Sequence, residues 1–184
     1  MSKKFTNVYQ FKITLRDVKP PVWRRIHVPE TFTFRHLHHA IQDSMGWGGH
    51  HLHAFEIINP RTGLRDSIGE TKEDGLLEDK ISIPAYFSMN NKKALYTYDF
   101  GDNWEHNILL EKILPRDATI KYPICITGKR ACPPDDCGGP WGYEDLLKVI
   151  SDPEHVEHDY MVEWVGEDFD PERFAAIAVI FHAV

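Results

Sequence analysis

The sequence predicts an α+β protein with an antiparallel or mixed sheet, and three observations carry that prediction. Residues 9–16 alternate apolar and polar side chains, which is the period of a half-buried strand. Residues 34–45 instead carry apolar side chains at helical spacing. Two further alternating runs, 94–100 and 104–113, flank a Gly-Asp-Asn turn and predict a second β-hairpin. Strands combined with separate helices in one short chain are typical of the α+β class.

The opening of the chain is expected to form a hairpin, a helix and a third strand. The Lys-Pro-Pro run at 19–21 interrupts the first strand, and residues 22–28 alternate again and form the second. Thr33 is the expected N-cap of the helix and Gly46 its end. Residues 52–58 then form the third strand. This order also suits a β-grasp-like arrangement, by analogy of fold.

The remaining segments are less regular. Residues 61–82 are charged and lack periodicity, so we expect a loop excursion on the surface. Residues 115–142 hold all three cysteines, five prolines and four glycines, which predicts an irregular loop. Residues 143–184 are predicted to be helical, and Asp170-Pro171 is a start signal for a last helix.

Length and composition bound the class of protein. A chain of 184 residues favours a single domain over residues 1–184. Hydrophobic residues make up 42% of it, which excludes wholesale disorder. No apolar run approaches the ~18 residues of a membrane span. The N-terminus lacks the apolar stretch of a secretory signal, so we expect a cytoplasmic protein without a membrane partner.

The net charge of −7 is unevenly distributed. Residues 1–50 hold eight Lys/Arg against three Asp/Glu, whereas residues 151–184 hold one Arg against nine acids. A basic N-terminal face that includes Arg24, Arg25 and Arg35 makes nucleic-acid binding one hypothesis. The negative total disfavours it. We favour docking of this face against the acidic end, within one chain or in a homodimer.

The second hairpin carries a candidate metal site. If its loop has three residues, Asp99 faces Glu105 across the ladder and Asp102 lies in the turn between them. Carboxylates this close repel one another unless a proton or a divalent cation such as Mg²⁺ or Ca²⁺ lies among them. With His106 they make a metal-dependent hydrolase or nuclease one hypothesis. Ordinary turn chemistry is the alternative for Asp102, and hydrogen bonding to backbone or Arg is the alternative for Asp99.

The cysteines allow three states. Cys125, Cys132 and Cys137 have a C-x6-C-x4-C spacing that is not a standard zinc pattern, so a fourth ligand would have to come from elsewhere, for example from the eleven histidines. Reduced structural thiols, a zinc or similar site, and a Cys132–Cys137 disulfide all stay open.

Several motifs occur in an order that resembles a known family. They are Pro-Pro-Val-Trp-Arg-Arg at 20–25, Tyr-Asp-Phe-Gly-Asp-Asn-Trp-Glu-His at 98–106, and Cys-Pro-Pro-Asp-Asp-Cys-Gly-Gly at 132–139. In this order they resemble the plasmid pRiA4b open-reading-frame-three-like family, over about residues 9–174. The resemblance implies a link to plasmids and mobile elements and no established activity. We therefore expect an uncharacterised binding or accessory module.

The expected site is a cleft between the second hairpin, the third strand and the cysteine loop. Its candidate residues are His51, His53, Trp47, Tyr98 and Trp104. Asp99 and Asp102 would be its anionic or cation-binding groups. His53 and His106 would be ligands, or would act as a base with Asp99 as the orienting carboxylate. Satisfied core histidines are the alternative.

Overall fold

The structure is a computed structural model, and it describes residues 5–71, 73 and 75–182. The strands are β1 (Asn7–Leu15), β2 (Trp23–Pro29), β3 (His53–Ile58), β4 (Arg65–Gly69), β5 (Leu76–Leu77), β6 (Lys93–Tyr98), β7 (Trp104–Pro115) and β8 (Ile124–Lys129). The helices are α1 (Phe34–Met45), α2 (Gly139–Ser151) and α3 (His158–Val165), with short 3-10 turns η1 (Ile83–Ala85) and η2 (Ala176–Ala178).

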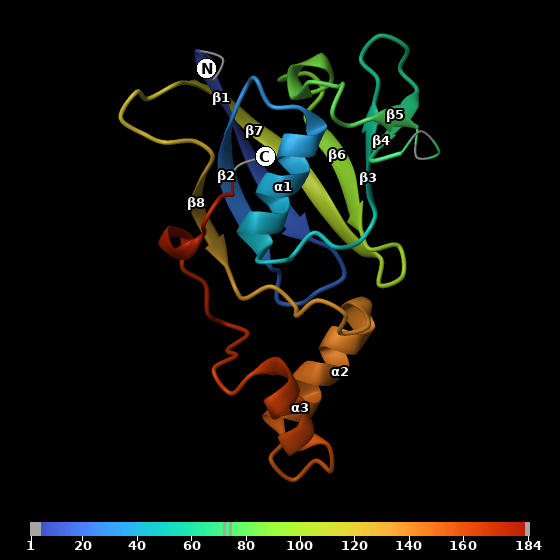
Figure 1. The fold of residues 1–184 in the computed structure, drawn as a ribbon, viewed down its shortest axis with the longest axis vertical. Helices are drawn as coiled ribbons and strands as arrows, with labels where there is room; N and C mark the ends of the chain where they lie inside the picture. Colours follow the sequence, from blue (N-terminus) through green and yellow to red (C-terminus); the bar gives the residue numbers. More distant parts are fainter. Residues whose placement is uncertain (1–4, 72, 74, 183–184) are drawn as a thin grey trace.

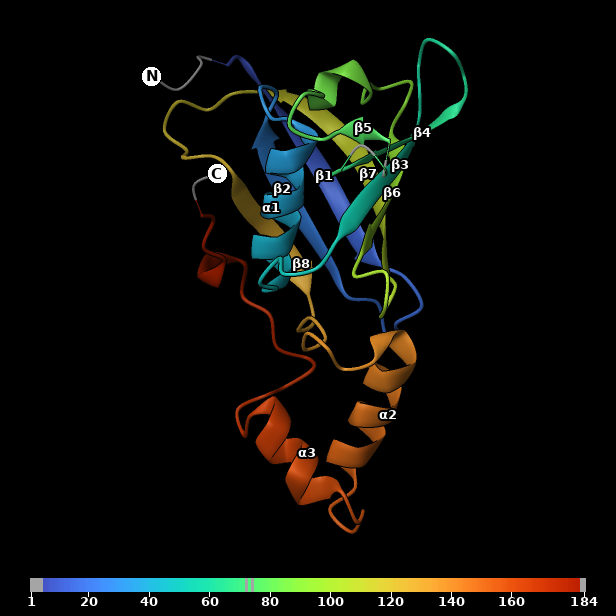
Figure 2. The same ribbon diagram turned by 45° about the vertical axis from the view of Figure 1, so that its right-hand side comes forward.

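The strands form one open eight-stranded sheet with the order β5-β4-β3-β6-β7-β1-β2-β8. Neighbours are antiparallel except β4 and β5, which run parallel. Helix α1 lies across one face of the sheet, whereas α2 and α3 extend beyond one end of it (Figures 1 and 2). The α+β class predicted from the sequence is confirmed. Within the residues that the structure describes, no helix is long and apolar enough to cross a membrane.

The opening hairpin and helix form as predicted. β1 pairs with β2 from Val8↔Pro29 to Thr14↔Trp23. α1 follows Thr33 and ends at Gly46, whose φ of 93° is the left-handed conformation that favours glycine at a helix end. Between β1 and α1 the core is fully buried, because the strand alternation and the helical spacing direct their apolar side chains to the same interface.

Two segments expected to be irregular contain strands. Residues 61–82 hold β4 and β5, and Ile68 of β4 is fully buried opposite Phe55 of β3. Residues 115–142 hold β8, where Cys125 pairs with Ile26 of β2. β5 and β8 are the edge strands of the sheet, and β4 lies next to β5. Pairing with a neighbour stabilises them, and local periodicity does not reveal that.

The last predicted helix does not form. Only the short turn η2 occurs within residues 171–178, and the rest of that segment is non-helical. Its side chains contact the sheet edge instead. The ring of Phe174 lies 3.8 Å from the Arg24 guanidinium, and Glu172 forms an ion pair of 2.7 Å with Arg130. These contacts hold the segment against β2 and β8 in place of helical hydrogen bonds.

Candidate cation-binding site

The turn between β6 and β7 is longer than three residues. Tyr98 pairs with Trp104, so residues 99–103 form the turn. Asp99 has a φ of 54°, and its carbonyl accepts a hydrogen bond from the Asn103 N–H at 2.6 Å. The expected pairing of Asp99 with Glu105 is therefore wrong, because β6 ends directly before Asp99.

The other two acidic residues of this hairpin have separate partners. Glu105 lies opposite Thr97 and forms an ion pair with Arg16. The Oδ2 atom of Asp102 accepts a hydrogen bond of 3.1 Å from the Gly138 N–H. The structure therefore does not bring the three carboxylates of the hairpin together around one position, and turn anchoring accounts for Asp102.

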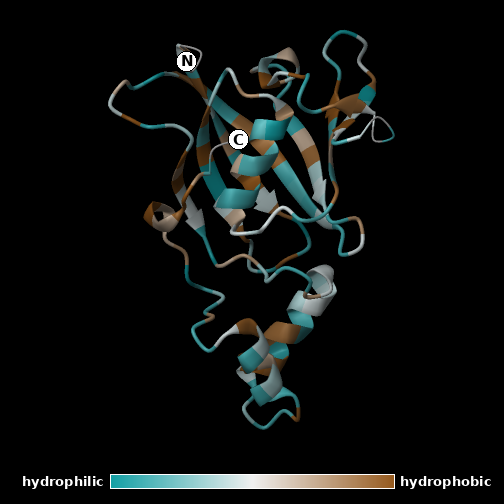
Figure 3. Cartoon of the chain, viewed as in Figure 1, coloured by the Kyte–Doolittle hydropathy of each residue, from teal (hydrophilic) through white to brown (hydrophobic). Residues whose placement is uncertain are grey.

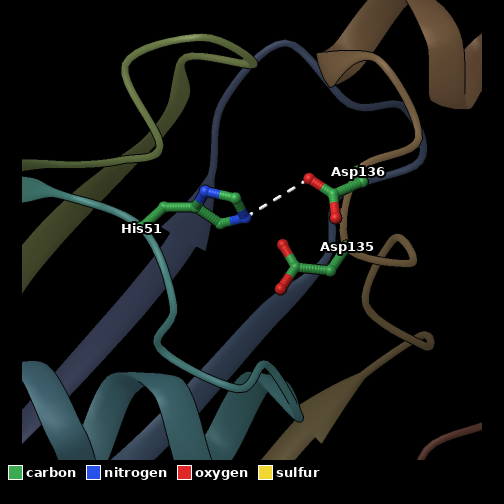
Figure 4. Close-up of side chains that lie close together, drawn as sticks. All are labelled: His51, Asp135 and Asp136. Atoms are coloured by element: carbon green, nitrogen blue, oxygen red, sulfur yellow. Dashed lines mark ion pairs between the residues drawn. The ribbon is translucent and has the colours of Figure 1, made fainter.

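A different group of potential ligands meets at the same end of the sheet (Figure 4). His51 lies two residues before the start of β3, whereas Asp135 and Asp136 lie in the loop before α2. The Nε2 atom of His51 is 3.3 Å from Oδ1 of Asp136. One ligand atom from each of the three residues lies within 4.8 Å of the others, and no further group of three His, Cys, Asp or Glu side chains does so in the described part of the chain.

The surroundings of this group are strongly acidic. Asp99 adds a third carboxylate, with its Oδ2 3.8 Å from Nδ1 of His51. Burial raises the pKa of Asp135, His51 opposes that shift, and the negative charge of Asp136 adds to it. The Tyr98 hydroxyl donates a hydrogen bond of 3.4 Å to Oδ2 of Asp135. Oδ1 of Asp135 is buried and has no hydrogen-bond partner among the residues described.

Aromatic side chains form the inner wall beside these groups. The rings of Trp47 and Tyr98 stack with centroids 5.2 Å apart, and Trp104 lies 5.7 Å from Trp47. The Trp47 indole N–H donates to the Pro133 carbonyl at 2.9 Å. The hairpin, the start of β3 and the cysteine loop therefore meet, which is the set of elements that the sequence nominated.

His53 and His106 are buried and have partners of their own. His53 Nε2 is 2.7 Å from a carboxylate oxygen of Glu78, and its ring stacks on His38 at 3.5 Å. His106 is fully buried, with Nδ1 3.4 Å from the Tyr96 carbonyl oxygen. Burial lowers the pKa of His106 to about 4, so this ring is neutral near pH 7. Their expected convergence with the hairpin carboxylates does not occur, because both rings point into the core between α1 and the sheet.

Two of the three arginines of the predicted basic face have partners within the protein. Arg24 is buried, and its Nε donates to the Ser44 carbonyl at 2.8 Å. Arg25 forms an ion pair of 2.6 Å with Glu111. Arg35 is exposed. Strand alternation sends the first two to opposite faces of β2, so the three side chains do not form one accessible stripe.

The cysteines are free thiols in the structure, and the Cys132–Cys137 disulfide is absent. Burial raises the pKa of Cys132, and burial also raises the pKa of Cys137 to about 12. Burial raises the pKa of Cys125 as well. In the described part of the chain no cysteine belongs to a group of three potential metal ligands, which favours the reduced structural state.

Sequence reasoning missed three residues of the buried and acidic clusters: Glu78, Asp135 and Asp136. The two aspartates stand within the Cys-Pro-Pro-Asp-Asp-Cys motif, so adjacent carboxylates in a constrained loop were the available signal. Glu78 offered none, because it follows the short edge strand β5 in a segment without periodicity.

The fold and this cluster define an α+β protein with a candidate site in the loops at one end of an open sheet. The chain belongs to the family described as plasmid pRiA4b ORF-3-like protein, whose model matches residues 7–177. The family resemblance read from the motifs is thereby confirmed.

Two relatives support this assignment. The chain is 37% identical over 167 residues to the uncharacterized protein y4hQ of Sinorhizobium fredii (strain NBRC 101917 / NGR234), which covers 89% of this chain and 84% of that protein. It is 50% identical to a protein of unknown function, MM3350, from Methanosarcina mazei Go1, whose crystal structure matches with a TM-score of 0.94 over 97% of this chain and 100% of that one. The names of both relatives leave their activity undefined.

Proposed function

We propose that this protein is a binding module for a divalent transition-metal ion such as Zn²⁺, held by His51, Asp135 and Asp136. The observation that carries the proposal is the approach of these three ligand atoms to within 4.8 Å of one another. One imidazole and two carboxylates are a donor set that suits zinc and its neighbours better than Mg²⁺ or Ca²⁺, which prefer oxygen ligands alone.

Local electrostatics support a cation at this position. The carboxylates of Asp99, Asp135 and Asp136 surround a single imidazole, and a buried oxygen of Asp135 lacks a hydrogen bond within the described residues. A bound cation relieves the repulsion among the carboxylates and satisfies that oxygen. Without one, the raised pKa of Asp135 records the cost of keeping its charge.

The geometry supports binding better than catalysis by the hairpin. Three protein ligands leave positions open for water or an added ligand. The stacked rings of Trp47 and Tyr98 lie beside them as an apolar wall. The hydrolase or nuclease hypothesis needs His106 as a catalytic group, and that side chain is fully buried.

Calorimetric titration of chelator-treated protein with ZnCl₂ tests the proposal. We expect one ion per chain, and we expect Asp135→Asn with Asp136→Asn to weaken binding at least about tenfold, because each loses a charged ligand. Asp168→Asn, an exposed aspartate beyond α3, is the control and should bind as the wild type does. Absence of stoichiometric binding, or equal affinity in the double variant, would overturn the proposal.

A further inference from the structure

The helices α2 and α3 form a hairpin that stands apart from the sheet (Figure 2). No residue of α3 is buried, and an isolated helix of eight residues is marginal in water. Residues 139–170, which contain both helices, hold ten Asp/Glu and a single Lys. The hairpin is therefore an acidic projection whose second helix has little packing of its own.

A groove of about 390 Å³ runs between the two helices. Leu146 and Val149 of α2 and Trp164 of α3 give it an apolar lining, and Figure 3 shows apolar segments on both helices. Asp145 and Glu157 stand on its two sides and make the rim acidic. The surface combines an apolar floor with negative edges.

Aromatic side chains at this groove are unusually open to solvent. Tyr160 is 65% exposed and Trp164 is 44% exposed, and they stand one helical turn apart on α3. Large aromatic groups beside an apolar groove are typical of the centre of a protein interface, where burial on binding yields the most free energy.

The charges of the groove determine what it fits. No Lys or Arg lines it, and Lys148, the one basic residue nearby on α2, is 3.1 Å from both Glu144 and Asp145. Asp136, which contributes to the proposed cation site, also lines the groove. We propose that the α2–α3 groove binds a basic amphipathic helix of a partner protein, with its apolar face on Trp164 and Tyr160 and its Lys or Arg side chains on the acidic rim.

A second copy of this chain fits the groove less well. Of the two arginines of β2, Arg24 is buried and Arg25 is paired with Glu111, so neither is free to meet the rim. A partner whose basic side chains are free meets the rim without breaking ion pairs of its own, while Asp145 shares or exchanges its pair with Lys148.

Fluorescence anisotropy with a labelled helical Leu/Lys peptide tests this proposal. We expect saturable binding that weakens with salt, and no binding of a peptide of the same composition scrambled to lose its apolar face. Tyr160→Ala with Trp164→Ala should weaken binding about tenfold or more. Asp145→Asn with Glu157→Gln should weaken it and flatten the salt dependence. Asp152→Asn with Glu154→Gln removes the same charge between the helices, outside the groove, and should bind as the wild type does.

Several results would overturn the proposal. Equal binding of the scrambled peptide, or equal weakening by the Asp152 and Glu154 control pair, would reduce it to non-specific attraction. Self-association that only the groove variants abolish would show that a second copy is the occupant. If the aromatic variant melts early, the charge variant decides, because it removes no packing. None of these variants touches His51, Asp135 or Asp136, so zinc titration of the same proteins separates a failure here from a failure of the proposed cation site.

Discussion

His38 and His53 stack inside the protein with ring centroids 3.5 Å apart and planes inclined by 10°. His38 Nδ1 lies 2.8 Å from the Tyr96 hydroxyl, whereas His53 Nε2 lies 2.7 Å from Glu78. Burial lowers the pKa of His38 to about 2, and the neighbouring His53 adds to that shift. This cluster ties α1 to β3, β6 and the segment after β5, and it serves packing rather than exchange with solvent.

Buried neutral histidines predict a loss of stability in mild acid. The folded-state pKa of His106 lies below its ordinary 6.5, so the unfolded chain binds a proton there that the folded chain does not. Stability should therefore fall as pH drops from about 6.5 towards about 4, by about 3 kcal/mol for one such group. Urea unfolding across that range measures it. His106→Gln should reduce the number of protons taken up on unfolding in this pH range by about one. An uptake equal to that of the wild type would contradict this account.

The two neighbouring arginines of β2 should differ in how much their removal lowers the free energy of unfolding. Arg24→Ala removes a buried guanidinium that donates to the carbonyls of Ser44 and Lys129, so it should lower the free energy of unfolding by about 3 kcal/mol. Arg25→Ala breaks a partly buried ion pair with Glu111 and should cost less, about 1 kcal/mol. Urea denaturation of both variants compares them. Equal costs would mean that the burial of Arg24 contributes nothing.

At the scale of elements, the β6–β7 turn and the start of α2 fit closely together. The Gly138 N–H donates to Asp102, and Gly139 has a φ of 69° with its backbone against the same residue. A Cβ at Gly139 would lie 2.4 Å from the Asp102 carbonyl oxygen. This contact positions the loop that carries Asp135 and Asp136.

Gly139→Ala should therefore destabilise the protein by more than about 2 kcal/mol, because a left-handed φ and a backbone clash combine. Gly166→Ala is a matched control. Its φ of 94° is also left-handed, but nothing lies within 4 Å of its Cβ, so it should cost only about 1 kcal/mol. Thermal or urea unfolding separates the two, and a Gly139 variant no worse than the Gly166 variant would disprove the close fit.

The sequence predicted those elements in which the spacing of apolar residues matches the side chains that are buried. From Phe11 to Leu15, β1 buries every second side chain, and the apolar side chains of α1 recur every third or fourth residue. Such patterns can be recognised without knowing what the element packs against. β4 and β8 differ, because Ile68 and Cys125 are buried by pairing with strands distant in the sequence. The Asp170-Pro171 signal misled for the same reason: contacts of Phe174 and Glu172 with the sheet edge overrode a local helix preference.

The candidate site was predictable by region and only partly by residue. His51, Trp47 and Tyr98 lie where the motifs nominated them. Asp135 and Asp136 join them only because the loop before α2 folds back onto the hairpin, and that proximity depends on tertiary contacts. The Asp99–Glu105 pairing failed on turn length: the turn has five residues instead of three, so Asp99 lies in the turn and Glu105 pairs with Thr97.

For the whole molecule, stability is expected to be uneven. The sheet and α1 share one fully buried core, whereas α3 contributes no buried residue. Amide hydrogen exchange followed by mass spectrometry should show the slowest exchange in β1 and β7 and fast exchange in α3. Addition of the Leu/Lys peptide should slow exchange in α3. Protection of α3 equal to that of β1 in the free protein would contradict this uneven distribution.

The cation site is the central claim, and anomalous diffraction from crystals grown with Zn²⁺ tests it most directly. We predict one strong peak at about 2.0–2.2 Å from a ring nitrogen of His51 and from carboxylate oxygens of Asp135 and Asp136. A crystal without a peak at these side chains, or with its zinc held by Cys132 and Cys137 instead, would contradict the account.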